Sequence, residues 1–428
     1  MEPSRDFVDN HATVFSRKAE IQVDGVDIPV KIGSTEGGQL HMETNRISPE
    51  GLSTQIYPEV TGRTESGERI VVTDLFVFAD EFVSLNPSIV EICNSEDRVV
   101  EGEEVYLTAD VLGFQHQSRT QFSDPDDRVD LIERTDWRAG SGNTADWSIS
   151  VRPLPDYPTR VNSIQNYQNL VRTVQFDVSI SGIYGGLDRA ATVTDGLLSE
   201  ITWLSSFVQG TLPSHSKIEI REDTSDPEDQ PDYVRLRTLH GNVGGCCKTG
   251  NLLFTVKQEQ SVFLDRAYDT FQEKQDSLEL RKILGFYADS LDPNRPVDIK
   301  LANLCIAAEM LADRYLEEDP GATADMISGL VDGVGVEYQD LIPDKGSLKT
   351  QYGDDIYERD DITPEYFWCR ARNHVIHGGS SVTTTEISRD YNALLILLQR
   401  ILREILLEGN TESLLGMSDL EPNNFVSL

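Results

Sequence analysis

The residues with the clearest chemical potential in this chain lie together in the segment ARNHVIHGG, residues 371–379. Arg372 is followed by Asn373 and by two histidines, His374 and His377, before a pair of glycines. A histidine has an ordinary pKa of about 6.5 and can exchange a proton near neutral pH, whereas an arginine keeps its positive charge. This combination suits acid–base chemistry on an anionic substrate, and in particular metal-free cleavage of RNA.

Sequence signals place this segment on a helix. A Thr-Pro pair at 363–364 suits the N-cap and the first helical position, and the glycines at 378–379 suit the end of the helix. On an ideal helix Asn373 and His377 lie about 40° apart, while Arg372 lies roughly 140° from His377. In one copy of the chain, the arginine and the histidine therefore do not point directly at a common substrate. Two copies across a two-fold axis could surround a cleft with two of each.

Each of these side chains has a role in such a cleft. His377 can take a proton from the ribose 2′-OH or return one to the leaving 5′-oxygen. Arg372 offers a bidentate fork to the phosphorane-like transition state. Asn373 can orient His377 one helical turn away or bind a phosphate oxygen.

The charge of the chain is strongly acidic. It has 428 residues, with 73 Asp and Glu against 37 Lys and Arg, a net charge of −36, and only ten of the basic residues are lysine. An acidic excess spread along the chain indicates a protein from a salt-adapted prokaryote, in which a Debye length of about 3 Å screens self-repulsion. The alternative, an acidic partner-binding protein or nucleic-acid mimic, fits less well because the acidic residues are not massed in a tail. The net charge therefore does not exclude an RNA substrate.

Two absences in the sequence bear on location and chemistry. The chain has no run of 18 apolar residues, and its N-terminus lacks the apolar core of a secretory signal, so we expect a cytoplasmic protein without membrane contact. The five cysteines lack metal-ligand spacing and are expected to be reduced, and we expect no metal and no cofactor.

The first half of the chain has the pattern of β-structure. Residues 21–32 alternate apolar and polar residues on either side of an Asp-Gly pair, which predicts a hairpin. The polar stretch 116–147 is predicted as a long loop region, and a helix is predicted near 194–210. Further strands are predicted at 69–78, 173–180, 216–220, 233–239 and 252–256.

Apolar residues at helical spacing dominate after about residue 258. The predicted helices cover 261–291, 298–318 with Asp298 as N-cap, 323–335, the motif segment and 386–409, with a loop at 343–354. The predicted fold class is α+β. A β-rich N-terminal region (1–257) precedes an all-α bundle (258–410) and a C-terminal tail (411–428).

The sequence Arg372-Asn373-His374-Val375-Ile376-His377 resembles the Arg-x4-His signature of the HEPN superfamily of helical-bundle ribonucleases. The stretch LANLCIAAEMLADRYL before it and the long amphipathic helix after it fit the same pattern. The arrangement looks most like the Apea-like HEPN branch, in which a β-rich region precedes the bundle. The resemblance covers residues 258–408, and over 1–257 it is architectural.

The resemblance implies a homodimer whose motif helices form a shared site and cleave RNA without metal, in antiviral defence or as a toxin. Arg372 and His377 match the catalytic pair of the family and Asn373 matches its polar partner. Three further residues are candidates for supporting roles: Glu309, His374 and Arg370. For Arg370 the alternative is an exposed ion pair, and for Glu309 it is a buried acid paired with an arginine.

Other functions stay open at the level of sequence. The bundle could be an inactive RNA-binding or dimerisation module, and the β-rich region could select the substrate or sense a trigger. A trigger ligand or antitoxin leaves no signature in this chain. The glycine-rich stretch GNVGGCCKTG at 241–250 is not a phosphate loop, because Asn and Cys stand where that loop needs glycine.

Overall fold

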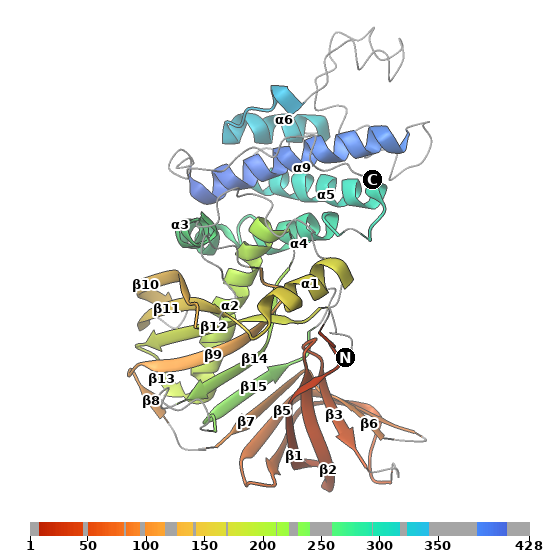
Figure 1. Cartoon of the computed structure of the whole chain (residues 1–428), viewed down its shortest axis with the longest axis vertical. Coiled ribbons are helices and arrows are strands. Elements are labelled where there is room, and N and C mark those ends of the chain that lie inside the picture. The colour runs from red at the N-terminus through yellow and green to blue at the C-terminus, as the bar shows by residue number, and fades with distance from the viewer. Residues whose placement is uncertain are drawn as a thin grey trace, which may run out of the picture. The chain divides into compact units, whose positions relative to one another are not determined.

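The computed structural model in Figure 1 falls into two compact units. One comprises Met1–Thr202 and Pro213–Val243, and the other comprises Trp203–Leu212 and Gly244–Leu428. Strands dominate the early part of the chain and helices the later part, which confirms the α+β class. The structure describes residues 8–45, 50–80, 83–94, 99–115, 126–139, 143–167, 170–210, 212–221, 230–239, 259–292, 294–316, 323–341 and 383–408.

The β-rich unit is built on one large antiparallel sheet of 13 strands, with β8 and β13 as a separate two-stranded sheet. The order in the large sheet is β10-β11-β12-β9-β14-β15-β7-β5-β4-β1-β2-β3-β6, and β5 also pairs with β6. The strands are β1 Thr13–Val23, β2 Val26–Thr35, β3 Leu40–Thr44, β4 Gln55–Thr64, β5 Arg69–Ala79, β6 Val83–Asn86, β7 Ile89–Cys93, β8 Val99–Glu101, β9 Val105–Leu112, β10 Val129–Ala139, β11 Asn143–Pro153, β12 Arg172–Ser181, β13 Tyr184–Gly186, β14 Ser214–Arg221 and β15 Tyr233–Arg237.

The predicted hairpin at 21–32 is confirmed. β1 and β2 pair from Val23 and Val26 outward, and the two residues between them have positive φ, 52° for Asp24 and 77° for Gly25. Positive φ at both central residues is the signature of the tight turn whose twist matches that of the flanking strands. The Asp-Gly pair therefore sets the register of the first two strands.

Part of the sheet closes on itself. The extra pairing of β5 with β6 turns β5, β4, β1, β2, β3 and β6 into a ring, which is completed where Met42 of β3 faces Leu85 of β6. Apolar side chains on alternate positions fill its interior, among them the fully buried Ile28, Ile32 and Ile70. In a small barrel such side chains fill the interior by themselves and form its core.

β5 also carries the sheet out of this ring. Its second half pairs with β6, and its first half, Arg69–Thr73, pairs with β7. Pro87 lies between β6 and β7. Because proline has no backbone N–H to donate, the hydrogen-bond ladder between strands is interrupted there. The sheet then continues through β15, β14, β9, β12 and β11 to β10. The strand predicted at 173–180 is confirmed as β12, and its alternate residues Val174, Phe176, Val178 and Ile180 are buried.

The predicted loop at 116–147 is wrong over much of its length. β10 and β11 form an antiparallel hairpin there, with the T-shaped pair Trp137 and Trp147 on it. β10 contains two register shifts, at Asp130/Ile132 and at Arg134/Trp137. These bulges interrupt the alternation of apolar and polar residues by which a strand is recognised in sequence.

The structure describes two helices within the first 210 residues. α1, Tyr157–Tyr167, was not predicted, and α2, Leu187–Gln209, begins seven residues before the predicted start at 194. The first turns of α2 bury mostly small residues, Ala190, Ala191 and Thr194, so the hydrophobic signal at the beginning of the helix is weak. Gly210, with φ of 65°, ends α2.

The described residues of the second unit are mostly helical. α5 packs against α4, α6 and α9, and α9 also packs against α3 and α6 (Figure 1). The predicted helices at 298–318, 323–335 and 386–409 are confirmed as α5, α6 and α9. The elements are α3 Glu259–Lys274, α4 Leu280–Ser290, α5 Val297–Tyr315, α6 Thr323–Val334, a short 3-10 helix η1 Gln339–Leu341 and α9 Thr384–Leu407.

Two details of the helical prediction are wrong. The single helix expected at 261–291 is divided into α3 and α4, because Glu279 takes the left-handed conformation with φ of 52° and turns the chain. Asp298 is not the N-cap of α5. Pro296 occupies that position, and the Asp298 carboxylate accepts a hydrogen bond from the backbone of Ile299 at 2.9 Å within the first turn.

Several predictions lie outside the described residues: the strand at 252–256, the loop at 343–354, the motif helix and the tail at 411–428. Of the helices that the structure describes, none combines the length and apolar character required to cross a membrane.

Candidate functional site

The structure describes one of the predicted site residues. Glu309 lies in the C-terminal half of α5 and is partly buried. The other five lie outside the described residues: Arg370, Arg372, Asn373, His374 and His377. The structure therefore does not test whether these side chains meet, and their roles stay predictions.

Two elements, η1 and α9, flank this segment in the chain. Before it, η1 ends at Leu341, which is buried. After it, Thr383 caps α9: its hydroxyl accepts a hydrogen bond from the backbone N–H of Glu386, whose carboxylate accepts one from the N–H of Thr383. This reciprocal capping box fixes where α9 begins.

α9 is held to its neighbours in the bundle by polar side chains as well as by its apolar stripe. The Tyr391 hydroxyl donates to the carbonyl of Ser290 in α4 at 3.0 Å, and the ammonium group of Lys300 in α5 lies 6.0 Å from the Tyr391 ring. Gln399 donates to the hydroxyl of Tyr287 at 2.8 Å in the buried interior. These contacts determine the rotation of α9 about its axis.

A polar pocket of about 460 Å³ lies between α9 and the segment that ends in η1. In it Arg400 forms a two-pronged ion pair with Asp340, both contacts at 2.8 Å, and donates to the carbonyl of Glu337 at 2.8 Å. The hydrogen bonds from Arg400 hold the pKa of Asp340 below its usual range. Arg403 and Glu404 also line the pocket. Because Arg400 is satisfied by Asp340, we interpret it as a clamp that fixes η1 to α9.

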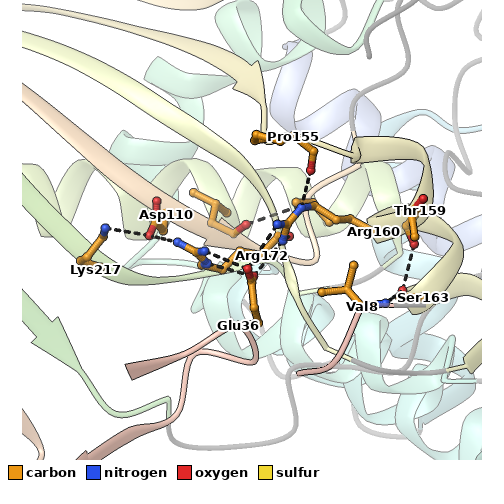
Figure 2. Close-up of polar contacts among 11 residues, drawn as sticks. Val8, Glu36, Asp110, Pro155, Thr159, Arg160, Ser163, Arg172 and Lys217 are labelled. Atoms are coloured by element: carbon orange, nitrogen blue, oxygen red, sulfur yellow. Dashed lines mark hydrogen bonds and ion pairs between the residues drawn. The ribbon is translucent and has the colours of Figure 1, made fainter. Parts of the chain in front are cut away.

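The β-rich unit contains a buried network of charged side chains, shown in Figure 2. Glu36, which follows β2, accepts hydrogen bonds from Arg160 of α1 at 2.8 and 3.2 Å and from Arg172 of β12 at 3.0 and 3.1 Å. Arg172 also binds Asp110 of β9, and the ammonium group of Lys217 of β14 lies 3.1 Å from the same carboxylate. Each of the five side chains is at most 13% exposed. The network therefore joins four elements in a low-dielectric interior.

The carboxylates of this network are ionised at neutral pH. Burial alone would raise the pKa of Glu36, but the hydrogen bonds from Arg160 and Arg172 outweigh it and hold this pKa below its usual range. Burial would also raise the pKa of Asp110, and the charges of Lys217 and Arg172 lower it. Because each charged group binds a partner within the network, we interpret it as a structural tie between α1 and the sheet and not as a reactive site.

A second polar cluster lies where α2 packs on the sheet. Asp195 of α2 accepts hydrogen bonds from His215 of β14 and from Arg237 of β15, the latter at 2.9 Å. Burial raises the pKa of Asp195, but the bond from His215 and the charge of Arg237 overcome it and lower the value to about 2. Burial lowers the pKa of His215.

One turn earlier on α2, the guanidinium of Arg235 in β15 donates to Thr192 at 2.9 Å and binds Glu91 of β7 at 2.6 Å. A histidine–carboxylate pair such as His215 and Asp195 resembles the orienting pairs of catalytic sites. His215 is only 2% exposed, however, and cannot reach a substrate. We therefore interpret this cluster as structural too.

The sequence prediction missed both polar clusters. The strand YVRLR, Tyr233–Arg237, carries arginines at alternate positions between apolar residues, which signals a strand with one charged face. That signal does not reveal the partners. Arg235 binds Glu91, 144 positions away in the chain, and Arg172 binds Glu36, 136 positions away. Pairings at such separations follow from the folded sheet.

No model of a known protein family matches this chain, and no curated protein sequence matches it at a significant level. Among the described residues, no group of three or more His, Cys, Asp or Glu side chains is arranged to hold a metal ion. The functional argument therefore depends on the chain's own residues.

Proposed function

We propose that this protein is a metal-independent endoribonuclease of the HEPN type that acts as a homodimer, in antiviral defence or as a toxin. The observation that carries the proposal is the sequence Arg372-Asn373-x3-His377, followed at once by two glycines, within the helical part of the chain. The described helices α3, α4, α5, α6 and α9, which flank this segment in sequence, are compatible with a helical-bundle ribonuclease.

The proposed reaction needs a base, an acid and a stabiliser of negative charge. His377 takes the proton of the ribose 2′-OH, and the freed oxygen attacks the adjacent phosphorus. The bond from phosphorus to the 5′-oxygen breaks, and that oxygen leaves with a proton supplied by the second histidine of the dimer or by water. Arg372 stabilises the charge on the phosphoryl oxygens. The products are a 2′,3′-cyclic phosphate and a 5′-hydroxyl end.

Asn373 lies four residues before His377 and would hold its ring in the reactive orientation. We place Glu309, His374 and Arg370 around this pair as supporting groups. The β-rich unit would select the RNA or respond to a trigger.

The test is cleavage of total RNA by the purified protein in molar KCl with EDTA, beside Arg372→Ala and His377→Ala. We expect cleavage by the wild type to leave 2′,3′-cyclic phosphate ends and to fall at least about a hundredfold in both variants. Arg389→Ala, a change of the same type on α9, serves as the matched control and should retain activity.

Three results would contradict the proposal in different ways. Equal cleavage by the wild type and both site variants would place the reaction elsewhere or reveal a contaminant. Loss of cleavage on addition of EDTA would replace the metal-free chemistry by a metal-dependent one. RNA binding without cleavage, unchanged by His377→Ala, would favour an inactive RNA-binding or dimerisation module.

A further inference from the structure

We propose that the pocket between α9 and the segment ending in η1 is a binding site for a phosphate group, and that Asp340 competes with this ligand for Arg400. All of the described lining of the pocket belongs to the second unit. The site is independent of the proposed function, because a phosphate group can bind there whether or not the protein cleaves RNA.

Arg400 is held in the wall of the pocket with its donors already oriented. Its side chain is 9% exposed, and its Nη1 donates to the carbonyl of Glu337 at 2.8 Å. Nη1 and Nη2 also donate to the two carboxylate oxygens of Asp340, each at 2.8 Å. A planar guanidinium offers the same pair of parallel donors to a phosphate group as to a carboxylate. Arg400 is therefore prepared for an anion before a ligand arrives.

The two partners of this ion pair differ in their exposure. The side chain of Asp340 is 61% exposed, against 9% for Arg400. An exposed aspartate that leaves the pair regains its contact with water, whereas a buried arginine that loses its partner keeps an uncompensated charge. Asp340 can therefore be exchanged for another anion, and Arg400 favours such an exchange over being left without a partner.

A second arginine gives the pocket a preference among anions. Arg403 lies three residues after Arg400 on α9, so the two side chains are neighbours on the helix surface, and both line the pocket. The carboxylate of Glu404 is 3.9 Å from Arg403, which is beyond hydrogen-bonding distance. A carboxylate on Arg400 would use both of its oxygens there. A phosphate group has a further oxygen for Arg403, so we expect phosphate to bind more tightly than a carboxylate.

The size and charge of the pocket limit the ligand and its affinity. The volume of about 460 Å³ lies within the range of sites for small molecules. Glu337 and Glu404 also belong to the lining and oppose the approach of an anion. At molar ionic strength this repulsion is screened beyond about 3 Å, a distance within which hydrogen bonds to the arginines act. We therefore expect a small phosphomonoester to bind with a Kd on the order of 1 mM.

Exchange of Asp340 for a phosphate group would loosen η1. This 3-10 helix has three residues, Gln339–Leu341, and a helix that short has little stability of its own. The ion pair of Asp340 with Arg400 is one of the contacts that fix it to α9. A bound phosphate group removes this contact, so binding should be visible in the exchange of backbone amides in η1.

The test is isothermal titration calorimetry of the full-length protein with inorganic phosphate and with glycerol 3-phosphate, in molar KCl at neutral pH. Asp340→Asn removes the competing carboxylate and should tighten binding of both probes about tenfold. Arg403→Gln removes a charged donor and should weaken binding about tenfold. Acetate, the carboxylate probe, should bind the wild type more weakly than phosphate does. Acetate binding as tightly as phosphate would contradict a site built for a phosphate group.

Asp289→Asn is the matched control for Asp340→Asn. Asp289 is ion-paired with Arg295 at 2.9 Å in the same unit, and neither residue is part of the described lining of the pocket. This variant changes the net charge equally and should leave the affinity for phosphate unchanged. Equal tightening by both aspartate variants would indicate an adventitious ion only and would overturn the proposal. Unchanged affinity in Asp340→Asn, or no phosphate binding by any of these proteins, would overturn it too.

Hydrogen–deuterium exchange gives a readout of the displacement itself. Saturating phosphate should accelerate exchange at 338–341 in the wild type several-fold, and it should have a smaller effect in Asp340→Asn, where the ion pair is already absent. Slower exchange at 338–341 on binding would mean that phosphate joins Asp340 on Arg400 rather than replacing it, which would contradict the competition. Should Arg403→Gln not fold, the exposed Asp340→Asn still decides the outcome.

Discussion

Glu36 accepts hydrogen bonds from two arginines that would keep their charge if the carboxylate were neutralised. We predict that Glu36→Gln lowers the free energy of unfolding by about 3 kcal/mol, because removing one partner leaves buried charges without compensation. Urea titration in constant high salt measures this difference. The substitution keeps the size of the side chain, so the loss reports on charge rather than on packing.

Glu65→Gln is the control for that measurement. Glu65 lies 3.9 Å from Lys18 and is 74% exposed, and exposed ion pairs contribute less than about 1 kcal/mol. Glu65→Gln should therefore change the free energy of unfolding by at most a few tenths of about 1 kcal/mol. A loss as large as that of Glu36→Gln would show that the network of Figure 2 has no special weight.

Because the pKa of Asp195 is lowered from 3.8 to about 2, we predict that the stability of the folded protein decreases in acid. The folded state then binds this proton less readily than the unfolded state. The contribution of Asp195 to stability is complete above about pH 4 and is lost as the pH falls toward 2, by roughly 2 kcal/mol in all. Unfolding free energies at several pH values between 5 and 2 should show this loss.

In Asp195→Asn, which cannot titrate, that share of the pH dependence should disappear. Glu36 and Asp110 also have lowered pKa values and lose their contributions in the same direction, so a residual slope is expected. An unchanged slope in Asp195→Asn would mean that the carboxylate is not held by His215 and Arg237 as the structure has it.

At this scale the sequence revealed types of residue and not their partners. The motif Arg372-Asn373-x3-His377 can be recognised in the sequence because its members lie within six residues of one predicted helix. The partners of Glu36 and Arg235 come from strands that the fold brings together, and no local pattern announces them.

At the scale of secondary-structure elements, we predict that alanine substitutions at two glycines change the free energy of unfolding in opposite directions. Gly196 lies within α2 and a Cβ there would meet nothing within 4 Å, so Gly196→Ala should raise the free energy of unfolding by about 1 kcal/mol. Gly25 also has open space around it, but its φ of 77° is left-handed. Gly25→Ala should lower the same quantity by about 1 kcal/mol.

Thermal and urea unfolding of the two variants check this pair. Both substitutions add one methyl group in open space, so the backbone conformation alone separates them. Destabilisation by Gly196→Ala would indicate that α2 is not a regular helix at that point. A neutral Gly25→Ala would indicate a different turn between β1 and β2.

Elements with a regular pattern were predictable, and those with an interrupted pattern were not. The β1–β2 hairpin and α9 follow from an Asp-Gly turn and from a long apolar stripe. The β10–β11 hairpin was missed because bulges shift the alternation, and α3 and α4 were joined because the turn at Glu279 interrupts no stripe. The motif helix was predicted from capping residues, and it stays a prediction.

For the whole molecule, the net charge of −36 predicts a dependence on salt. Repulsion among the acidic groups should destabilise the folded state at low ionic strength and be screened at high ionic strength. We expect Tm to rise between about 0.1 M and 2 M KCl by at least 3 °C, roughly the shift given by 3 kcal/mol in a chain of this size. Differential scanning calorimetry across that range measures it, and a flat or falling Tm would contradict salt adaptation.

The order of β-structure followed by helices could be predicted from the change in hydrophobic period along the chain. The closed ring could not, because it depends on one strand, β5, pairing with different partners along its two halves. Nor does the sequence reveal that α2 contributes residues to both units, since the apolar spacing from Leu197 to Val208 continues across the boundary at Thr202.

The bulges of β10 have a consequence for neighbouring molecules. β10 is the end strand of the large sheet in its described part, and an end strand with free backbone groups can recruit a strand of another molecule. Many proteins prevent such self-association by charge, but molar salt would mute that protection. Two register shifts within one strand distort its edge, so that a second chain cannot pair along it. At high ionic strength, backbone shape can thus keep molecules apart where like charges no longer do.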